Sequence, residues 1–434
     1  MVIGALIIGL LVFMVLGVPV SFALLGISTL LLVVFYGPTQ LFILLGSFTN
    51  MIQNEVLLSI PFFILMASFL QLSGIGSDIY ETMNKWLGGL KGGLAMATVA
   101  ATALIAAMSG VAATGTISMG LIALPEMLKR GYDKILAAGP IMAGGVLGPI
   151  IPPSTVMIIA GAYSGVSTGK LFIGGVLPGL LLAISFMIYI AIRSNLHPEL
   201  APVIPKEERP SLKEKMVSLS RVIVPLLIII LVLGSIYAGV ATPTEAAGVG
   251  AFAAFTYTVL KRRLSFDGLK NAAWQTTVSS VMLLWIMFGG SAYSSLVNIT
   301  RMGEAISSFV NMINLGPMGL LFAIIVIVAI LGMFIEATAI IMITVPIFVP
   351  LVNMVGLDLF FVMLIYCITI CFGMLTPPFG VNIFYLKGVT PEGITLGDLY
   401  KAALPYCIII FVMILVFAFI MPDLLMWLPG KMLG

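Results

Sequence analysis

Long apolar runs separated by short polar stretches dominate the chain. Each run approaches the roughly 20 helical residues that cross the hydrocarbon core of a bilayer. Prolines and glycines lie inside these runs as well as between them. We therefore predict an all-α integral membrane protein with ten crossings, near residues 2–16, 20–36, 57–73, 135–165, 171–193, 219–238, 244–260, 274–296, 357–388 and 405–425.

Two further apolar segments, 94–128 and 317–354, are interrupted midway by polar and small residues. The interruptions are SGVAATGT, from Ser109 to Thr116, and GMFIEAT, from Gly332 to Thr338. Non-helical backbone is tolerated at membrane depth only where protein or a wet cavity satisfies its polar groups. Both segments are predicted to be re-entrant helical hairpins whose tips stop inside the membrane.

The second half of the chain repeats landmarks of the first at a nearly constant offset. Gly131–Asp133 recurs as Gly356–Asp358, and Gly148–Pro153 recurs as Gly373–Pro378, both 225 residues later. Each half contains five predicted crossings, an odd number, so the two copies must be inserted in opposite senses. This pattern predicts the inverted-topology repeat of secondary transporters.

Basic residues give an independent test of this topology, because cytoplasmic loops of membrane proteins are enriched in Lys and Arg. With the N-terminus outside, seventeen of the twenty basic residues fall on the cytoplasmic side, leaving Lys170, Arg301 and Lys431 outside. Both termini are therefore predicted to be periplasmic, in an inner membrane.

The predicted repeats span 1–200 and 219–434, joined by a polar cytoplasmic linker at 194–220. Each repeat has a broken helix, at 135–165 or 357–388, after its hairpin. Before the hairpins, segments 77–92 and 301–315 are amphipathic, which is typical of helices lying in the membrane interface. Such paired helices would link a moving hairpin domain to a fixed frame.

Composition agrees with a membrane protein. Hydrophobic residues make up 61% of the chain and charged residues only 9%. The three cysteines, Cys367, Cys371 and Cys407, lie in apolar segments and indicate neither a disulfide framework nor a metal site. The apolar N-terminus starts at Val2 without a basic flank, so no cleavable signal peptide is expected.

The broken helices carry the strongest chemical signal, because GPIIPPS and GMLTPPFG each place two prolines in mid-span. Proline removes backbone donors and leaves carbonyls without helical partners. Backbone carbonyls and hydroxyls are ligands suited to a sodium ion, and each break should face a hairpin tip. We predict two pseudo-equivalent sodium sites: Ser109, Gly110 and Thr114 with Gly148 and Ser154, and Gly332, Ala337 and Thr338 with Gly373 and Thr376.

The helix N-termini at the two tips would point their positive ends toward the midplane, where a carboxylate is stabilised without a buried Arg or Lys. The predicted substrate contacts are Ala113, Pro153, Glu336, Pro378 and Asn382. An alternative is that the Gly, Ser, Thr and Pro residues only permit close helix packing. Glu336, an acid inside the membrane, is a functional candidate by default, and capping of a helix is an equal alternative.

Several chemistries are excluded by the residues present. The stretch Gly165–Lys170 is one residue short of a phosphate-binding loop and lacks the hydroxyl that binds magnesium, so ATP hydrolysis is not expected. The single histidine, His197, lies in the linker, which excludes a Ser–His protease and a histidine proton relay within the membrane. We expect no enzyme activity, no cofactor beyond a coupling sodium ion, and no nucleic-acid binding.

The hairpin and broken-helix motifs resemble a known family. SGVAATGTISMGLIALPEMLKRGYD, GPIIPPS, ATPTEAAG, GMFIEATAIIMITVPIFVPLV and TPPFGVNIFYLKGV look like signature stretches of the large membrane subunit of tripartite ATP-independent periplasmic (TRAP) transporters. The resemblance covers essentially the whole chain. It implies an elevator-type, sodium-driven symporter of the ion transporter superfamily, importing organic acids such as C4-dicarboxylates or sialic acids.

The resemblance also implies two partners besides the lipid bilayer. These are a small four-helix membrane subunit, expected to be a separate chain, and a periplasmic substrate-binding protein that delivers the acid. A stand-alone sodium/carboxylate symporter of the same superfamily remains an alternative, and an ion channel or an intramembrane enzyme would fit the motifs less well.

Overall fold

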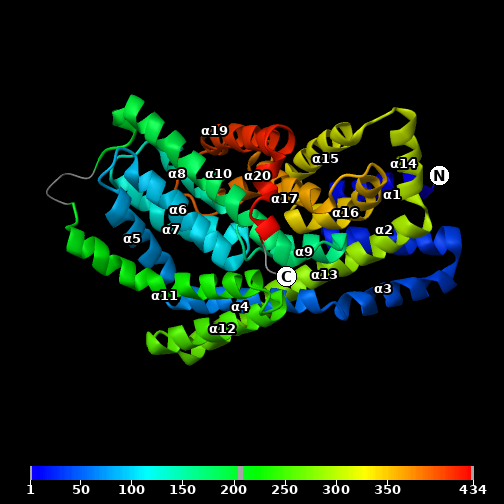
Figure 1. Cartoon of the computed structure of the whole chain (residues 1–434), viewed down its shortest axis with the longest axis horizontal. Helices are drawn as coiled ribbons and strands as arrows, with labels where there is room; N and C mark the ends of the chain where they lie inside the picture. Colours follow the sequence, from blue (N-terminus) through cyan, green and yellow to red (C-terminus); the bar gives the residue numbers. More distant parts are fainter. Residues whose placement is uncertain (1, 204–208, 432–434) are drawn as a thin grey trace.

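The computed structural model describes residues 2–203 and 209–431 of the chain. Over these residues the fold is all-helical, without β-strands, which confirms the all-α part of the predicted fold class. Six helical segments are long and apolar enough to cross a membrane: Glu55–Leu72, Thr168–Leu196, Leu212–Tyr237, Phe266–Ile299, Ala337–Met354 and Leu396–Ile420. Figure 1 shows an elongated molecule in which most helices are packed lengthwise.

The first part of the chain forms the following helices: α1 (Val2–Val15), α2 (Val20–Tyr36), α3 (Phe42–Ile52), α4 (Ser59–Leu72), α5 (Ile75–Leu87), α6 (Gly93–Ser109), α7 (Ala112–Lys129), α8 (Lys134–Gly145), α9 (Thr155–Ser164) and α10 (Thr168–Leu196). The second part forms α11 (Leu212–Tyr237), α12 (Pro243–Leu260), α13 (Phe266–Ile299), α14 (Met302–Met312), α15 (Pro317–Gly332), α16 (Ala337–Met354), α17 (Leu359–Leu375), α18 (Val381–Lys387), α19 (Leu396–Leu415) and the short α20 (Pro422–Met426).

Several helices differ from the predicted spans: α3 has no predicted counterpart, and α11, α13 and α19 begin earlier than predicted. Helix α3 was missed, because its apolar run is short and ends in the polar pair Gln53–Asn54; the Asn54 side chain accepts from Val56 N at 3.1 Å and starts the next helical turn. Helix α13 begins well before the predicted span 274–296, because the Ser265 hydroxyl accepts from Gly268 N at 3.0 Å and caps a polar first turn.

We call α1–α4 and α11–α13 the frame, because these helices pack against one another along one side of the molecule (Figure 1). Glycines permit their close approach. A Cβ on Gly250 of α12 would lie 2.7 Å from Val232 of α11 and 2.8 Å from Met66 of α4. A Cβ on Gly289 of α13 would lie 2.4 Å from the Ser21 carbonyl oxygen of α2. The backbones of α13 and α2 are therefore in direct contact at this point.

We call α6–α10 and α15–α19 the hairpin domain. Elements from the two parts of the sequence alternate in its core: α7 and α8 pack on α18, α8 packs on α19, and α9 packs on α16. The ring of Tyr406 on α19 lies edge-on to Phe186 and Tyr189 of α10, at 5.2 and 5.3 Å between centroids. The helices of the hairpin domain therefore share one hydrophobic core.

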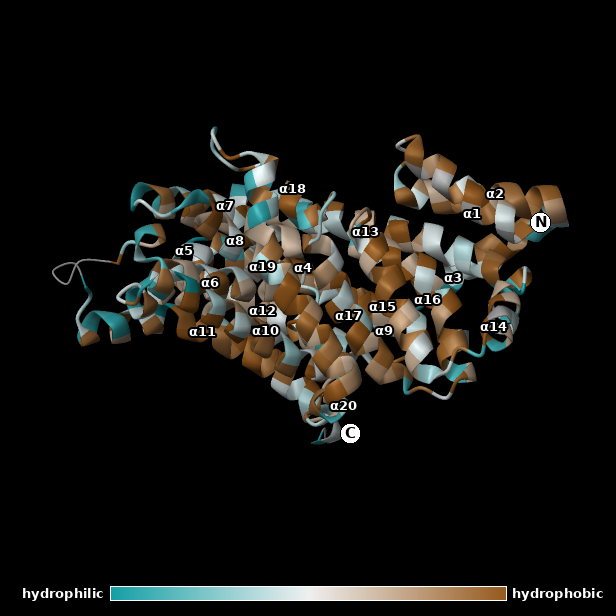
Figure 2. Cartoon of the chain, turned by 90° about the horizontal axis from the view of Figure 1, so that it is seen from above, coloured by the Kyte–Doolittle hydropathy of each residue, from teal (hydrophilic) through white to brown (hydrophobic). Residues whose placement is uncertain are grey.

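Hydrophobic residues colour most helices along their lengths, while hydrophilic ones gather near the end of the molecule that holds α5 and the start of α11 (Figure 2). Helix α5 is the amphipathic segment predicted at 77–92. Its buried face, which includes Ile75 and Ile79, packs on α6 of the hairpin domain, and it also packs on α11 of the frame. It thus lies between the two parts of the molecule.

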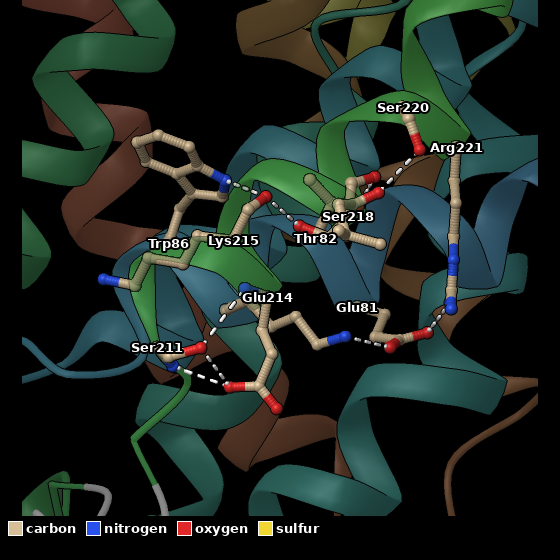
Figure 3. Close-up of polar contacts among 11 residues, drawn as sticks. Glu81, Thr82, Trp86, Ser211, Glu214, Lys215, Ser218, Ser220 and Arg221 are labelled. Atoms are coloured by element: carbon tan, nitrogen blue, oxygen red, sulfur yellow. Dashed lines mark hydrogen bonds and ion pairs between the residues drawn. The ribbon is translucent and has the colours of Figure 1, made fainter.

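Ion pairs fix α5 to α11 (Figure 3). The Glu81 carboxylate accepts from Lys85 Nζ at 2.5 Å on its own helix and from Arg221 at 2.9 Å on α11. The hydrogen bond from Lys85, aided by the charge of Arg221, holds the pKa of the Glu81 carboxyl below its ordinary value. The two ion pairs of Glu81 therefore stabilise the folded state at every pH at which its carboxyl is ionised.

Two further hydrogen bonds run from α5 to the backbone of α11 in the same view. The Thr82 hydroxyl donates to the Ser218 carbonyl at 3.1 Å, and Trp86 Nε1 donates to the Lys215 carbonyl at 3.2 Å. We call these contacts and the Glu81 ion pairs the α5–α11 clamp. They tie α5 to the frame.

Replacing Glu81 with Gln should lower the free energy of unfolding near neutral pH by less than about 1 kcal/mol, and the unfolding temperature slightly, because the ion pairs are partly exposed. The lowered pKa means that this stabilisation is present above the ordinary pKa of 4.5 and is lost as the pH falls through the lowered value. The gap between wild type and variant should therefore close in acid.

The matched control is Glu304→Gln on α14, whose contact with Arg301 is longer, at 3.7 Å, and highly exposed. Thermal unfolding of both variants at neutral and acid pH checks the prediction. A Glu81→Gln variant no less stable than the control at neutral pH would contradict it.

Candidate functional site

Two breaks between helices meet at one cavity of about 400 Å³. Helix α6 ends at Ser109, Gly110 adopts a left-handed φ of 65°, and α7 begins at Ala112. Helix α15 ends at Gly332 and α16 begins after Glu336. We call residues 109–114 the first tip and 332–338 the second tip. Both lie where the interrupted segments were predicted.

The frame completes the walls of this cavity. Besides the tips, its polar lining comprises Ser68, Gln71, Ser118, Thr155, Gln275, Ser279 and Tyr385. Glu336 is the one charged side chain among the lining residues, which include no Lys, Arg or His. The cavity therefore has a mostly apolar wall with several polar groups and no basic side chain, and any anion inside it must be stabilised by backbone dipoles, hydroxyls, amides or a bound cation.

The first tip packs on the break between α8 and α9. The Thr155 hydroxyl donates to the Gly110 carbonyl at 2.8 Å. A Cβ on Gly110 would lie 2.9 Å from Thr155 N and 3.0 Å from the Pro153 carbonyl, so only glycine fits there. Gly148 approaches the same tip, because its Cβ would lie 3.2 Å from Ala112 N.

The hydroxyls predicted for the first sodium site already have partners in the protein. Ser109 Oγ donates to carbonyls of its own turn, at 3.0 Å for Ala106 and 3.1 Å for Val111. Ser154 Oγ donates to the Pro149 carbonyl at 2.8 Å and caps α9. Ser109, Gly110 and Thr114 line the cavity, whereas Gly148 and Ser154 lie behind the tip.

The second tip packs on the break between α17 and α18 in a different way. A Cβ on Gly332 would lie 2.8 Å from Gly373 Cα, so the two helices touch through their backbones. The Gly380 N–H donates to the Met333 carbonyl at 3.0 Å. Thr376 Oγ1 donates to the Phe372 carbonyl at 2.6 Å. The breaks at the prolines thus satisfy backbone groups of both tips.

Of the residues predicted for the second sodium site, Ala337 and Thr338 line the cavity, and Gly332, Gly373 and Thr376 do not. Glu336 also lines the cavity and caps α16: its carboxylate accepts from Thr338 N at 2.9 Å and from the Thr338 hydroxyl at 3.3 Å. The capping alternative for Glu336 is therefore observed, with the side chain still facing the cavity.

The predicted substrate contacts separate into two sets. Ala113 and Glu336 line the cavity, whereas Pro153 and Pro378 lie in the proline turns behind the tips. Asn382 is fully buried and lies outside this lining: it accepts from the Thr116 hydroxyl and donates to the Met142 carbonyl, both at 2.8 Å. In this structure, Asn382 joins α18 to α7 and α8.

Several cavity residues were not predicted. Gln71 and Gln275 carry amides within otherwise apolar helices of the frame, and Thr155 follows Ser154 directly. The signal available in the sequence was the amide side chains inside membrane-spanning runs, which are rare without a role. The prediction concentrated on the interrupted segments and so overlooked the frame.

A smaller cavity of about 280 Å³ continues from the first. The two share Ala67, Gln71 and Ser118 in their linings, and the smaller one reaches the α4–α5 turn at Gly74 and Ser77. Together they form a path along the boundary between the frame and the hairpin domain.

Metal chemistry finds no support in the described residues, which contain no group of three His, Cys, Asp or Glu side chains placed to hold a metal ion. Cys367, Cys371 and Cys407 are free and buried in the structure. The cavity contains oxygen ligands of the kind that hard cations accept, and these come from the backbone, hydroxyls and one carboxylate.

Gly332→Ala should destabilise the second tip, because the added methyl would lie 2.8 Å from Gly373 Cα. Backbone atoms cannot move aside as easily as the end of a flexible side chain. Gly316→Ala is the matched control: it lies at the start of the same hairpin, has a negative φ and has open space around it. Thermal unfolding of the purified variants should show a loss for Gly332→Ala of roughly 1–3 kcal/mol. Equal stability of the two variants would show that the tip is not tightly packed.

The chain matches the family model described as the tripartite ATP-independent periplasmic transporter, DctM component, over residues 7–422. It is 33% identical over 407 residues to the C4-dicarboxylate TRAP transporter large permease protein DctM of Pseudomonas aeruginosa, covering 94% of this chain and 93% of the relative. It is 28% identical to the sialic acid TRAP transporter large permease protein SiaM of Vibrio cholerae, with 96% of each chain covered.

Solved structures with the same fold include the YdaH transporter of Alcanivorax borkumensis, with a TM-score of 0.66 and 16% identity over 92% of this chain and 90% of that one. The efflux pump MtrF of Neisseria gonorrhoeae gives a TM-score of 0.66 and 15% identity over 92% and 85%. At these identities the likeness concerns the fold alone. The family match and its relatives establish the rest: the chain belongs to the large permease (DctM) family of TRAP transporters, and is a membrane transport subunit, not an enzyme.

Proposed function

We propose that this chain is the permease of a sodium-coupled symporter that imports an organic acid across the bacterial inner membrane. The observation that carries the proposal is the cavity in which both tips meet, whose polar lining consists of backbone, hydroxyls, amides and the Glu336 carboxyl, with no basic side chain. A carboxylate in such a site needs positive charge from elsewhere. The N-terminus of α7 and a bound sodium ion would supply it.

The sodium ligands would be backbone carbonyls at the tips and at the proline breaks. The Gly110 carbonyl at the first tip is positioned by a hydrogen bond from the Thr155 hydroxyl, and the Met333 carbonyl at the second tip by one from the Gly380 N–H. Each tip therefore has ordered oxygen atoms beside a proline break. We propose the predicted sets as starting points, with Thr155 added to the first because it lines the cavity and contacts Gly110.

The proposed movement is of the elevator type, with two copies of one unit in opposite orientation. Two features support the repeat: α6 and α15 begin at Gly93 and Pro317, and α7 and α16 begin at Ala112 and Ala337, at nearly the same offset. The frame would remain fixed while the hairpin domain carries the site. The smaller cavity, which ends at the α4–α5 turn, would then be the route of release to the cytoplasm.

The substrate class is proposed from the cavity and from the relatives together. The relatives' names specify a C4-dicarboxylate, sialic acid and, for the Escherichia coli permease YiaN at 29% identity, 2,3-diketo-L-gulonate. A cavity of about 400 Å³ suits molecules of this size. We propose an organic acid of the C4-dicarboxylate or sialic acid class, with a periplasmic binding protein and a small four-helix membrane subunit as partners and with both termini in the periplasm.

A stand-alone sodium/carboxylate symporter is the second candidate, because the cavity is formed by this chain alone. It predicts uptake without a binding protein. The proposed function predicts uptake of a labelled acid into proteoliposomes only when an inward sodium gradient, the small subunit and a matching binding protein are all present. Uptake that persists without sodium would overturn the proposal, and uptake without a binding protein would favour the alternative.

Ser154→Ala and Thr376→Ala should each raise the sodium concentration that gives half-maximal uptake, because each hydroxyl lies at a proline break beside a tip. Thr256→Ala on α12 is the control, since its hydroxyl also donates to a helix carbonyl but lies in the frame. Sodium titrations of uptake in proteoliposomes give the measurement. An unchanged sodium dependence in both site variants would refute these two ligand assignments.

A further inference from the structure

A second large cavity, of about 460 Å³, lies away from the tips, between α1 and α13–α16. Its lining is almost entirely hydrocarbon, with Leu10 from α1, Ile306 from α14, Ile324 from α15 and Phe348 from α16. Of its few polar atoms, the Thr344 hydroxyl is already satisfied by the Ile340 carbonyl at 2.8 Å and by Tyr366 at 2.7 Å. The cavity is built for an apolar occupant.

The cavity opens to the outside of the molecule. Ile313 and Ile327 both belong to its lining and are 48% and 42% exposed. In a membrane protein, an apolar opening on a helix such as α15 faces the acyl chains of the bilayer. An occupant can therefore enter sideways from the lipid, without crossing water.

One polar group in the lining has no partner. Tyr293 on α13 is 3% exposed and lines the cavity, and its hydroxyl makes no hydrogen bond with any described residue. Buried hydroxyls are normally hydrogen-bonded, because leaving one unpaired is costly. The occupant should therefore offer one acceptor oxygen close to an otherwise apolar body.

The basic residue Arg301 directly precedes Met302, which lines one end of the cavity. Arg301 follows Tyr293 in sequence by about two helical turns. Its side chain is 76% exposed, and its contact with Glu304 is long, at 3.7 Å. Arg301 is therefore available to an anionic group near the end of the cavity that Met302 lines.

The two amphipathic helices differ in what covers them. Helix α5 packs along α6 and is fixed by the α5–α11 clamp (Figure 3). Helix α14 packs on α16 and α13, but the apolar cavity separates its face from α15. Protein therefore covers the apolar face of α5, whereas the corresponding face of α14 borders the apolar cavity.

We propose that this cavity is a phospholipid site. One acyl chain fills the apolar space between α14 and α15, its ester carbonyl accepts a hydrogen bond from Tyr293, and the headgroup phosphate pairs with Arg301. The lipid completes the packing of α14. This site is independent of the substrate cavity and does not rest on the proposed sodium coupling.

Native mass spectrometry of the purified chain with added phosphatidylglycerol tests the site. Ala323→Trp fills the cavity from α15 and should lose the retained lipid. Val326→Trp, the same change on the exposed side of α15 and outside the lining, should keep it. Equal lipid retention in the two variants would overturn the proposal. So would an Ala323→Trp variant that keeps the lipid but no longer co-purifies with the small subunit, because that result would assign the cavity to a partner helix.

The hydroxyl and the cation are tested without changing the cavity's shape. Wild type should retain a diester phospholipid better than the diether lipid with the same chains and headgroup, and Tyr293→Phe should abolish that preference. Arg301→Gln should weaken retention of the phospholipid but not of a diacylglycerol with the same chains. If wild type makes no ester–ether distinction, or if Arg301→Gln affects both lipids equally, the assignment of these two residues is wrong.

Discussion

In a bilayer, every backbone N–H and C=O must find a partner inside the protein, and this constraint shapes the whole hairpin domain. Its four interruptions are stable only because they satisfy one another. Thr155, beside one proline break, donates to the Gly110 carbonyl at the first tip, and Gly380, beside the other break, donates to the Met333 carbonyl at the second. Tips and breaks must therefore lie together at one place, and the cavity forms where they do.

The same constraint explains why the hairpin domain can act as one body. Its polar bonds cross between the two parts of the sequence, as where Asn382 joins α18 to α7 and α8. Around the cavity at the tips, by contrast, the frame contributes the amides of Gln71 and Gln275, which make no hydrogen bond with the described residues. Polar contacts within the hairpin domain are thus specific, whereas these two amides of the frame bond to no other described residue.

The sequence predicted the all-helical class and the family, because apolar runs and proline motifs are local signals. It located the interruptions for the same reason. It missed α3, whose apolar run is too short to stand out, and it placed the start of α13 too late, because Ser265 extends that helix through a polar turn. The substrate contact named for Asn382 stays a prediction, and no local pattern in the sequence shows that its amide also bonds Thr116 and Met142.

The two tips are related in sequence but differ in chemistry, and the difference has a physical cause. At the second tip, Glu336 places its own carboxylate on the N-terminus of α16 and bonds Thr338 N. At the first tip, Val111 precedes α7 and supplies no capping side chain, so the N-terminal N–H groups of that helix remain available in the cavity. Since an anion gains most where a helix N-terminus is uncapped, the proposed substrate carboxylate would be stabilised best at the first tip. The carboxylate at the second tip instead favours a cation.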